Sequence, residues 1–96
     1  MKKATIIYTK HLENRLKLRK IDHNLPLKIC EEAKDRYYDE ETGHHIAVMD
    51  IELYNTTREV MVAYTIQGDT LNLLTVHPLK AGQKENRVEA GRWRKI

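Results

Sequence analysis

Three side chains near the start of this 96-residue sequence have the types and the spacing for phosphate chemistry. His11, Arg15 and Arg19 recur at intervals of four residues, so a helix would place them side by side on one stripe. Histidine gives or takes a proton near neutral pH, because its ordinary pKa of about 6.5 leaves both forms populated. Arginine stays protonated, and its planar fork grips two phosphate oxygens. We read this stripe as one half of a candidate catalytic site.

A second group of the same residue types stands near the other end of the chain. His77, Arg87 and Arg92 follow the last apolar run. Cleaving RNA without a metal needs a base for the ribose 2′-hydroxyl, an acid for the departing 5′-oxygen, and fixed cations for the charge that grows on the phosphorane. The two groups together contain all of these. The same pattern is also typical of a solvated basic surface, and spacing alone favours that second interpretation.

Trp93 stands between Arg92 and Arg94, a composition that suits a platform on which an unpaired base stacks. A tryptophan near a chain end also closes the edge of a core. The sequence leaves both interpretations open and favours core closure.

The five histidines raise the question of a metal site. No cysteine or carboxylate stands at zinc-finger or metalloprotease spacing from any of them, and His44 and His45 would point to opposite faces of a strand. The sequence also has no glycine-rich phosphate loop and no Gly-x-Ser-x-Gly elbow. We therefore expect neither a metal nor another cofactor.

The elements that must position these residues begin with a strand and two helices. A short β-branched run predicts a first strand at Ala4–Tyr8, and Thr9 stands at the N-cap of a helix over 10–19. A second helix begins around Pro26, and apolar residues at four-residue spacing carry it to near Tyr38.

Three more strands follow, at 45–53, 59–66 and 71–76. Short loops make them an antiparallel meander, with Gly68-Asp69 as one tight turn. Residues 84–90 have room for a short helix that Gly91 would end. The predicted fold is one α+β domain over residues 1–96, in the order β-α-α-β-β-β, with both helices on one face of an antiparallel sheet.

Charge divides the chain into three parts. Residues 1–36 hold ten Lys and Arg against five Asp and Glu, residues 37–76 hold one against seven, and residues 77–96 hold six against two. If the basic ends meet in space, they form a positive face that attracts the phosphates of RNA or an acidic protein. Solvated surface charge without a partner is the alternative.

Composition excludes several other classes of protein. The hydrophobic share is 41% and the charged share 32%, and no apolar run approaches the roughly 20 residues of a membrane span. The apolar run after the first lysines is too short for a secretion signal, so we expect a cytoplasmic protein without a membrane partner. Cys30 stands alone at an apolar-periodic position, as a buried structural thiol does.

Short motifs spread over residues 5–93 resemble those of a small bacterial family of unassigned function. They are Thr9-Lys10-His11 followed by Arg15, Arg19 and Ile21, then Tyr38-Asp39 before Thr42-Gly43, then Leu73-Leu74-Thr75-Val76, and finally Arg87-Val88-Glu89-Ala90-Gly91-Arg92-Trp93. That family is grouped with the RelE/ParE-type toxins, within the metal-independent RNases that include barnase and colicin D. The resemblance implies a RelE-like fold and RNA cleavage, with His11, Thr75 and His77 in the active site.

The leading hypothesis is a toxin-like endoribonuclease that needs no metal and acts on RNA, free or on the ribosome. In it His11 and His77 carry protons, and Thr75 stands beside them. The phosphate is held by Arg15, Arg87 and Arg92, and the rest of the RNA by Lys10, Arg19, Trp93 and Arg94. ParE-type relatives poison gyrase and are not nucleases, so a non-catalytic module that binds an acidic antitoxin-type protein is an alternative. RNA binding without cleavage is another.

Overall fold

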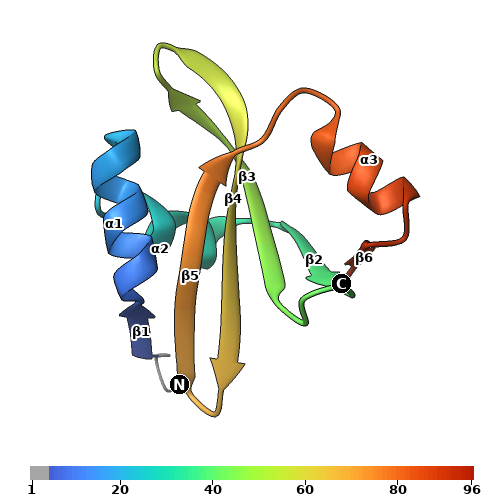
Figure 1. Ribbon diagram of the computed structural model, residues 1–96, viewed down its shortest axis with the longest axis horizontal. Helices are drawn as coiled ribbons and strands as arrows, with labels where there is room; N and C mark the ends of the chain where they lie inside the picture. The colour runs from blue at the N-terminus through green and yellow to red at the C-terminus, as the bar shows by residue number, and fades with distance from the viewer. Residues whose placement is uncertain (1–4) are drawn as a thin grey trace.

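The computed structural model describes residues 5–96 and contains six strands and three helices (Figure 1). In chain order they are β1 (Thr5–Tyr8), α1 (Lys10–Arg19), α2 (Leu25–Glu32), β2 (Asp35–Asp39), β3 (His45–Leu53), β4 (Thr56–Gln67), β5 (Thr70–Pro78), α3 (Gln83–Glu89) and β6 (Trp93–Lys95). The predicted α+β class is confirmed. Ala4, which was predicted to open the first strand, lies outside the described residues.

The strands form one mixed sheet in the order β1-β5-β4-β3-β2-β6. β3, β4 and β5 are antiparallel neighbours, which confirms the predicted meander, and Gly68 at φ 57° makes the turn between β4 and β5. β1 runs parallel to β5, so the prediction of a purely antiparallel sheet is wrong. A parallel pair needs a long crossover, and every element from α1 to β4 lies between these two strands in the chain.

The two N-terminal helices pack on the same face of the sheet, as predicted. Leu12 and Leu16 of α1 and Ile29 and Cys30 of α2 are buried there. Their strand partners in this core include Ala47, Val60, Val62, Leu73 and Val76. The thiol of Cys30 is therefore part of the core, as expected for a structural cysteine, and burial raises its pKa.

The opposite face of the sheet has a second, smaller core. Its members are Tyr37, Ile46, Val48, Met61, Ala63, Leu79 and Trp93. In Figure 1 the viewer looks onto this face, where α3 stands beside β6 in front of the sheet. Within the described residues no helix is drawn over β4 and β5 on this side of the sheet.

α1 begins where the sequence predicts. The hydroxyl of Thr9 accepts a hydrogen bond from the backbone N–H of Leu12 at 3.2 Å, as an N-cap does. Thr9 also donates its backbone N–H to the carbonyl of Leu73, which fixes the start of α1 against β5. This cap sets the direction in which the polar stripe of the helix faces.

The second helix ends earlier than predicted. α2 stops at Glu32, and Ala33 turns extended at ψ 131° instead of continuing the helical spacing to Tyr37. Arg36 donates hydrogen bonds to the carbonyls of Ala33 and Cys30, which satisfies acceptors at the end of the helix. The following residues pair with β3 and β6 as β2, so tertiary pairing overrides a helical apolar pattern here.

The C-terminal stretch is ordered and adds a helix and a strand. α3 covers Gln83–Glu89, close to the predicted 84–90, and Gly91 follows at φ 77°. The short strand β6 then pairs with β2, where Trp93 lies opposite Asp39. Neither β2 nor β6 was predicted, so the observed order of elements is longer than the predicted β-α-α-β-β-β.

Candidate functional site

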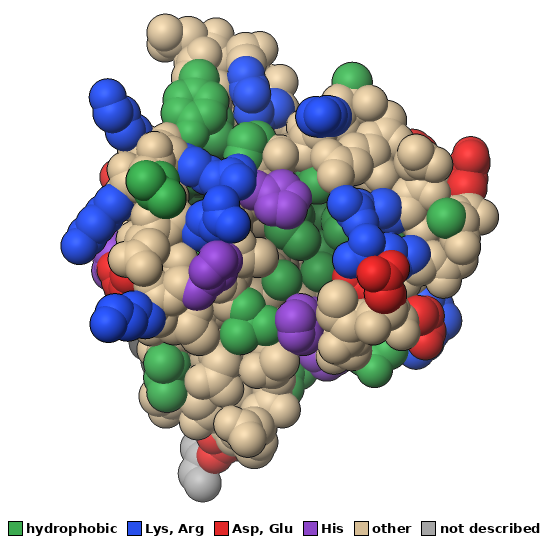
Figure 2. Space-filling view, in the orientation of Figure 1, with side chains coloured by type: hydrophobic (Ala, Val, Ile, Leu, Met, Phe, Trp, Pro, Cys, Tyr) green, Lys and Arg blue, Asp and Glu red, His purple; other side chains and the backbone are tan. Residues whose placement is uncertain are grey.

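The two basic ends of the chain meet on one face of the molecule. Figure 2 shows Lys and Arg side chains in two groups, one over α1 and one over α3 and β6. Between them lies a hollow in which apolar and histidine side chains are visible. The charge pattern of the sequence therefore becomes a groove with Lys and Arg on both walls, joined on the α3 side by Asp and Glu side chains, and with a floor formed by the sheet.

A cavity of about 190 Å³ lies in the groove on the side of α3. Four of the predicted catalytic residues and the predicted stacking tryptophan line it, namely Thr75, His77, Arg87, Arg92 and Trp93. Thr75 and His77 lie two residues apart on β5, so their side chains share one face of the strand and both line the cavity. The pairing of β4 with β5 is irregular just before Thr75, and such bulges re-aim side chains beside functional sites.

His77 is half-buried between the two positive walls. Burial lowers its pKa below the ordinary value, and the charges of Arg19, Arg87 and Arg15 lower it further. Arg15 and Arg19 belong to α1 and Arg87 belongs to α3, so His77 is within electrostatic reach of both walls. The imidazole is therefore neutral at pH 7 and able to accept a proton.

The α1 wall carries the predicted polar stripe. Nε of Arg15 donates a hydrogen bond to Nε2 of His11 at 3.3 Å, which confirms that these two side chains are neighbours. His11 and Lys10 are exposed, whereas Arg15 and Arg19 are half-buried. None of these residues lines the cavity beside α3. The stripe forms the opposite wall of the groove, and the charges of Arg15 and Arg19 on this wall act on His77.

Arg87 is the cation of the α3 wall that is free to bind an anion. Its guanidinium stands 5.4 Å from the centre of the Trp93 ring. Nε of Arg87 is buried, and within residues 5–96 it has no hydrogen-bond partner and no carboxylate paired with it. A buried donor without an acceptor is costly, so no partner within residues 5–96 competes with an anion for this side of the guanidinium.

Arg92 is occupied by carboxylates in this structure. Its guanidinium donates to both oxygens of Asp39 at 3.2–3.3 Å, and Glu41 lies 3.4 Å away. Arg94 is likewise paired with Glu40. A phosphate would have to displace these partners. The predicted phosphate-binding role of Arg92 and the RNA-binding role of Arg94 are therefore weaker than those of Arg15, Arg19 and Arg87.

Trp93 closes the edge of the smaller core, which was the second of its two interpretations. The residue is 2% exposed and packs against Tyr37 and Met61 in the smaller core. Arg87 stands over its ring, so no free ring face remains for a base. The predicted stacking role is inconsistent with this burial, because stacking needs an accessible ring face.

His44 is a residue of the cavity that the sequence did not single out. It lines the cavity together with His77 and Thr42. His44 immediately precedes β3 and lies two residues before Ile46, whose side chain points into the smaller core. Side chains two residues apart on a strand share a face, so the position of His44 beside Ile46 could have been predicted if the face of Ile46 had been known.

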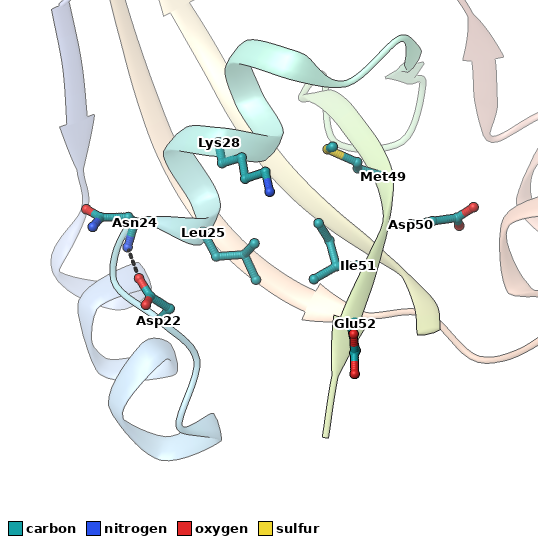
Figure 3. Close-up of a pocket in the computed structure, with 8 residues that line it drawn as sticks. All are labelled: Asp22, Asn24, Leu25, Lys28, Met49, Asp50, Ile51 and Glu52. Carbon is teal, nitrogen blue, oxygen red and sulfur yellow. Dashed lines mark hydrogen bonds between the residues drawn. The ribbon is translucent and has the colours of Figure 1, made fainter. Parts of the chain in front are cut away.

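A larger cavity, of about 520 Å³, lies away from the groove between the start of α2 and β3 (Figure 3). Leu25 and Ile51 point toward one another across it, and Lys28 reaches into it. Its polar rim is rich in carboxylates, contributed by Asp22, Asp50 and Glu52. Such a rim repels phosphate, so size does not make this cavity the site for RNA.

Within residues 5–96, no three His, Cys, Asp or Glu side chains are grouped so that they could hold a metal ion. None of the helices in that part of the chain is long and apolar enough to cross a membrane.

Comparison with known proteins finds no matching family model, no matching curated protein and no matching solved structure. The relationship to RelE/ParE-type toxins implied by the sequence motifs therefore stays a proposal.

Proposed function

We propose that the protein is an endoribonuclease that cleaves RNA by attack of the ribose 2′-hydroxyl, using histidine and arginine side chains. The observation that supports this most directly is the setting of His77. Its pKa is lowered by burial and then by Arg19, Arg87 and Arg15, so a neutral imidazole stands among three cations at neutral pH. A phosphodiester that enters the groove meets a proton acceptor and positive charge together.

The reaction moves two protons and exchanges one bond at phosphorus. His77 takes the proton of the 2′-hydroxyl, and the 2′-oxygen attacks phosphorus to form a 2′,3′-cyclic phosphate. The bond from phosphorus to the 5′-oxygen breaks, and that oxygen takes a proton from His11. Arg15 donates to Nε2 of His11 in the free protein, so its turn toward the phosphate frees that nitrogen to carry the proton.

The cations have separate tasks in this proposal. Arg87, whose Nε has no partner within residues 5–96, stabilises the charge that grows on the phosphorane. Arg15 and Arg19 hold the phosphate from the α1 wall, and Thr75 donates its hydroxyl from the floor. Lys10, exposed at the start of α1, attracts the flanking backbone. The relationship to RelE/ParE-type toxins, with cleavage of free or ribosome-bound RNA, is part of the same proposal.

The test is cleavage of an unpaired RNA oligonucleotide in the presence of EDTA. The expected products end in a 2′,3′-cyclic or 3′-phosphate and a 5′-hydroxyl, and an oligonucleotide with deoxyribose throughout stays intact. His77→Ala should lose about 100-fold or more of the rate, the usual effect of removing a general base. The matched control is His23→Ala, because His23 is exposed and pairs with Glu13 outside the groove. Full activity of His77→Ala would overturn the mechanism.

A second function is supported by the apolar floor of the groove. Ile46, Met61 and Ala63, each no more than 5% exposed, line the cavity beside α3, and an acidic amphipathic helix would lie above them between the basic side chains. An antitoxin-type protein would bind in this way and cover His77. This alternative predicts a complex that weakens as salt rises, and intact RNA under all conditions. RNA bound without cleavage, with an affinity that falls steeply with salt, would point to a nucleic-acid-binding module.

A further inference from the structure

The tip of the β3–β4 hairpin has a side chain that its backbone does not favour. Tyr54 and Asn55 form a two-residue turn with φ values of 55° and 63°. A turn of this kind needs positive φ at both positions, which Asn and Gly adopt easily and a bulky residue does not. Tyrosine at the first position therefore costs stability that asparagine would not cost. Strain of this kind gathers at functional sites.

The ring of Tyr54 is held in place and remains accessible. Its hydroxyl donates a hydrogen bond to the backbone carbonyl of Arg19, at the end of α1. The residue is nevertheless 49% exposed. Tyr8 and Tyr64, by contrast, pack against the core beneath the helices. A fixed aromatic ring with about half of its surface in solvent offers a flat face at little entropic cost.

Arg58 places a cation over one face of this ring and leaves the other face as the candidate for stacking. Its guanidinium lies 5.5 Å from the centre of the Tyr54 ring. Arg58 is the one Lys or Arg in residues 37–76, so the acidic third of the sequence places its single cation here. Nε of Arg58 is buried without a hydrogen-bond partner within residues 5–96. The tip therefore combines a half-exposed ring with a guanidinium over one of its faces.

The tip adjoins the groove through Arg19. The backbone of Arg19 accepts the hydrogen bond of Tyr54, and the charge of Arg19 acts on His77. Figure 1 shows the hairpin rising beside the end of α1, and Figure 2 shows apolar and basic side chains over that hairpin on the face of the groove. The tip therefore lies at the end of the α1 wall, in contact with Arg19.

The chemistry of the tip suits a base better than a phosphate. Asp50, Glu52 and Glu59 lie on the same hairpin and oppose a further negative charge. A base is uncharged, and its stacking on an aromatic ring does not depend on sequence, because every base has a π-face. The positive charge of the Arg58 guanidinium, 5.5 Å from the ring centre, adds to the attraction for a π-system.

We propose that Tyr54, with Arg58 beside it, is the platform on which one unpaired base of the RNA stacks. This inference rests on the proposed function and adds to it the place where substrate outside the scissile phosphate is recognised. It also assigns to the hairpin tip the stacking role that the burial of Trp93 leaves unfilled. The preferred substrate is accordingly a single-stranded segment rather than a duplex.

The test is binding of a short oligonucleotide of 2′-O-methyl RNA, which cannot be cleaved, measured by fluorescence anisotropy. Tyr54→Asn removes the ring and puts a favoured residue into the turn, so the urea midpoint should stay the same or rise. Its Kd should increase about 5-fold to 100-fold, the range for losing one stacked base. Tyr54→Phe keeps the ring and should bind within about 3-fold of the unaltered protein, since stacking needs only the ring. An oligonucleotide made of abasic nucleotides should bind Tyr54→Asn and the unaltered protein equally.

The outcomes separate this inference from the proposed cleavage. RNA cleavage by the unaltered protein with equal oligonucleotide affinity in Tyr54→Asn would overturn the platform and leave the mechanism standing. Ring-dependent binding without any cleavage of ordinary RNA would support the platform and overturn the proposed cleavage. No binding of the oligonucleotide by the unaltered protein would overturn the platform, as would a Tyr54→Asn defect that is equally large with the abasic oligonucleotide.

Discussion

Arg92 holds the buried carboxylate of Asp39 with both ends of its guanidinium, Nε at 3.2 Å from Oδ1 and Nη2 at 3.2 Å from Oδ2. Asp39 is 3% exposed, and it also accepts hydrogen bonds from the backbone N–H groups of Glu41 and Thr42. Burial alone would raise the pKa of Asp39, but the hydrogen bond from Arg92 and those from the backbone lower it below the ordinary value. This contact fastens the C-terminal segment to β2.

Arg92→Ala should therefore affect the free energy of unfolding more than it affects the rate of RNA cleavage. The change leaves the carboxylate of Asp39 buried without its cation, and we expect a loss of about 1–2 kcal/mol in the free energy of unfolding, discounted because Arg92 is partly exposed. Urea denaturation measures this. Arg94→Ala is the matched control, since its pair with Glu40 is exposed on both sides and should be worth less than about 1 kcal/mol. Equal losses in the two variants would contradict the assignment.

Lys84 fastens α3 to the sheet in the same manner. Its ammonium lies 3.0 Å from Asp35 and 2.8 Å from Glu59, so one cation joins α3 to β2 and β4. The hydrogen bonds to Glu59 and Asp35 raise the pKa of Lys84. Lys84→Met should cost about 1–3 kcal/mol of unfolding free energy, because two partly buried carboxylates lose their partner. Lys80→Met, at an exposed position, should cost little by the same measurement, and a comparable loss there would refute the prediction.

Stability should also fall as the pH drops below about 6.5 because of His77. Its folded pKa lies below the ordinary value, owing to burial and then to Arg19, Arg87 and Arg15. The unfolded chain thus binds the proton more readily, so the contribution of neutral His77 is complete above about pH 6.5 and is lost as the pH falls toward the folded value. A second decline should follow below about pH 4, where Asp35 and Asp39, whose pKa values are lowered, take up protons.

Urea midpoints measured from pH 7.5 to 3 separate the two steps. His77→Asn should flatten the upper step and leave the lower one, because the lower step belongs to the carboxylates. His23→Asn serves as the control, since His23 is exposed and should leave both steps in place. An upper step that persists in His77→Asn would show that another group causes it.

Local pattern was enough to predict part of the molecule. The cap at Thr9, the stripe of His11 and Arg15, and the β3–β5 meander follow from spacing of four or two residues and from short turns. The sequence did not predict β2, because Tyr37 continues a helical spacing that runs through Ile29 and Ala33. Only pairing with β3 and β6, distant in the chain, decides its conformation. Periodicity describes local spacing only, so it does not detect pairing between strands that are far apart in the sequence.

The site shows the same division. Thr75, His77 and Arg87 were predicted together and line one cavity. The roles predicted for Arg92 and Trp93 need accessible side chains. In the fold Asp39 binds Arg92 and the smaller core encloses Trp93, so neither side chain is accessible in the way those roles require. A single tyrosine in a turn has no periodic spacing, so the sequence pattern does not indicate a role for Tyr54. Its significance comes from a positive φ and from contacts with Arg19 and Arg58.

Removing the charge of Arg87 should change the pH dependence of cleavage as well as its rate. Arg87 lowers the pKa of His77, after burial and Arg19. In Arg87→Ala the pKa of His77 rises toward its ordinary value, so the acidic limb of kcat/KM against pH should move to higher pH. The shift should be partial, because burial and the α1 arginines remain. The rate at the optimum should fall by about 10-fold to 1,000-fold through the lost stabilisation of the phosphorane.

The control for Arg87→Ala is Lys34→Ala, which removes one exposed positive charge outside the groove and should leave the limb in place. A lower rate with an unmoved limb would keep Arg87 as a phosphate ligand and deny that its charge acts on the titrating histidine. A limb that moves to lower pH would exclude His77 as the base, because loss of a neighbouring cation can only make an imidazole easier to protonate. The direction of one pH shift thus tests the relationship between the α3 wall and β5 on which the proposed mechanism depends.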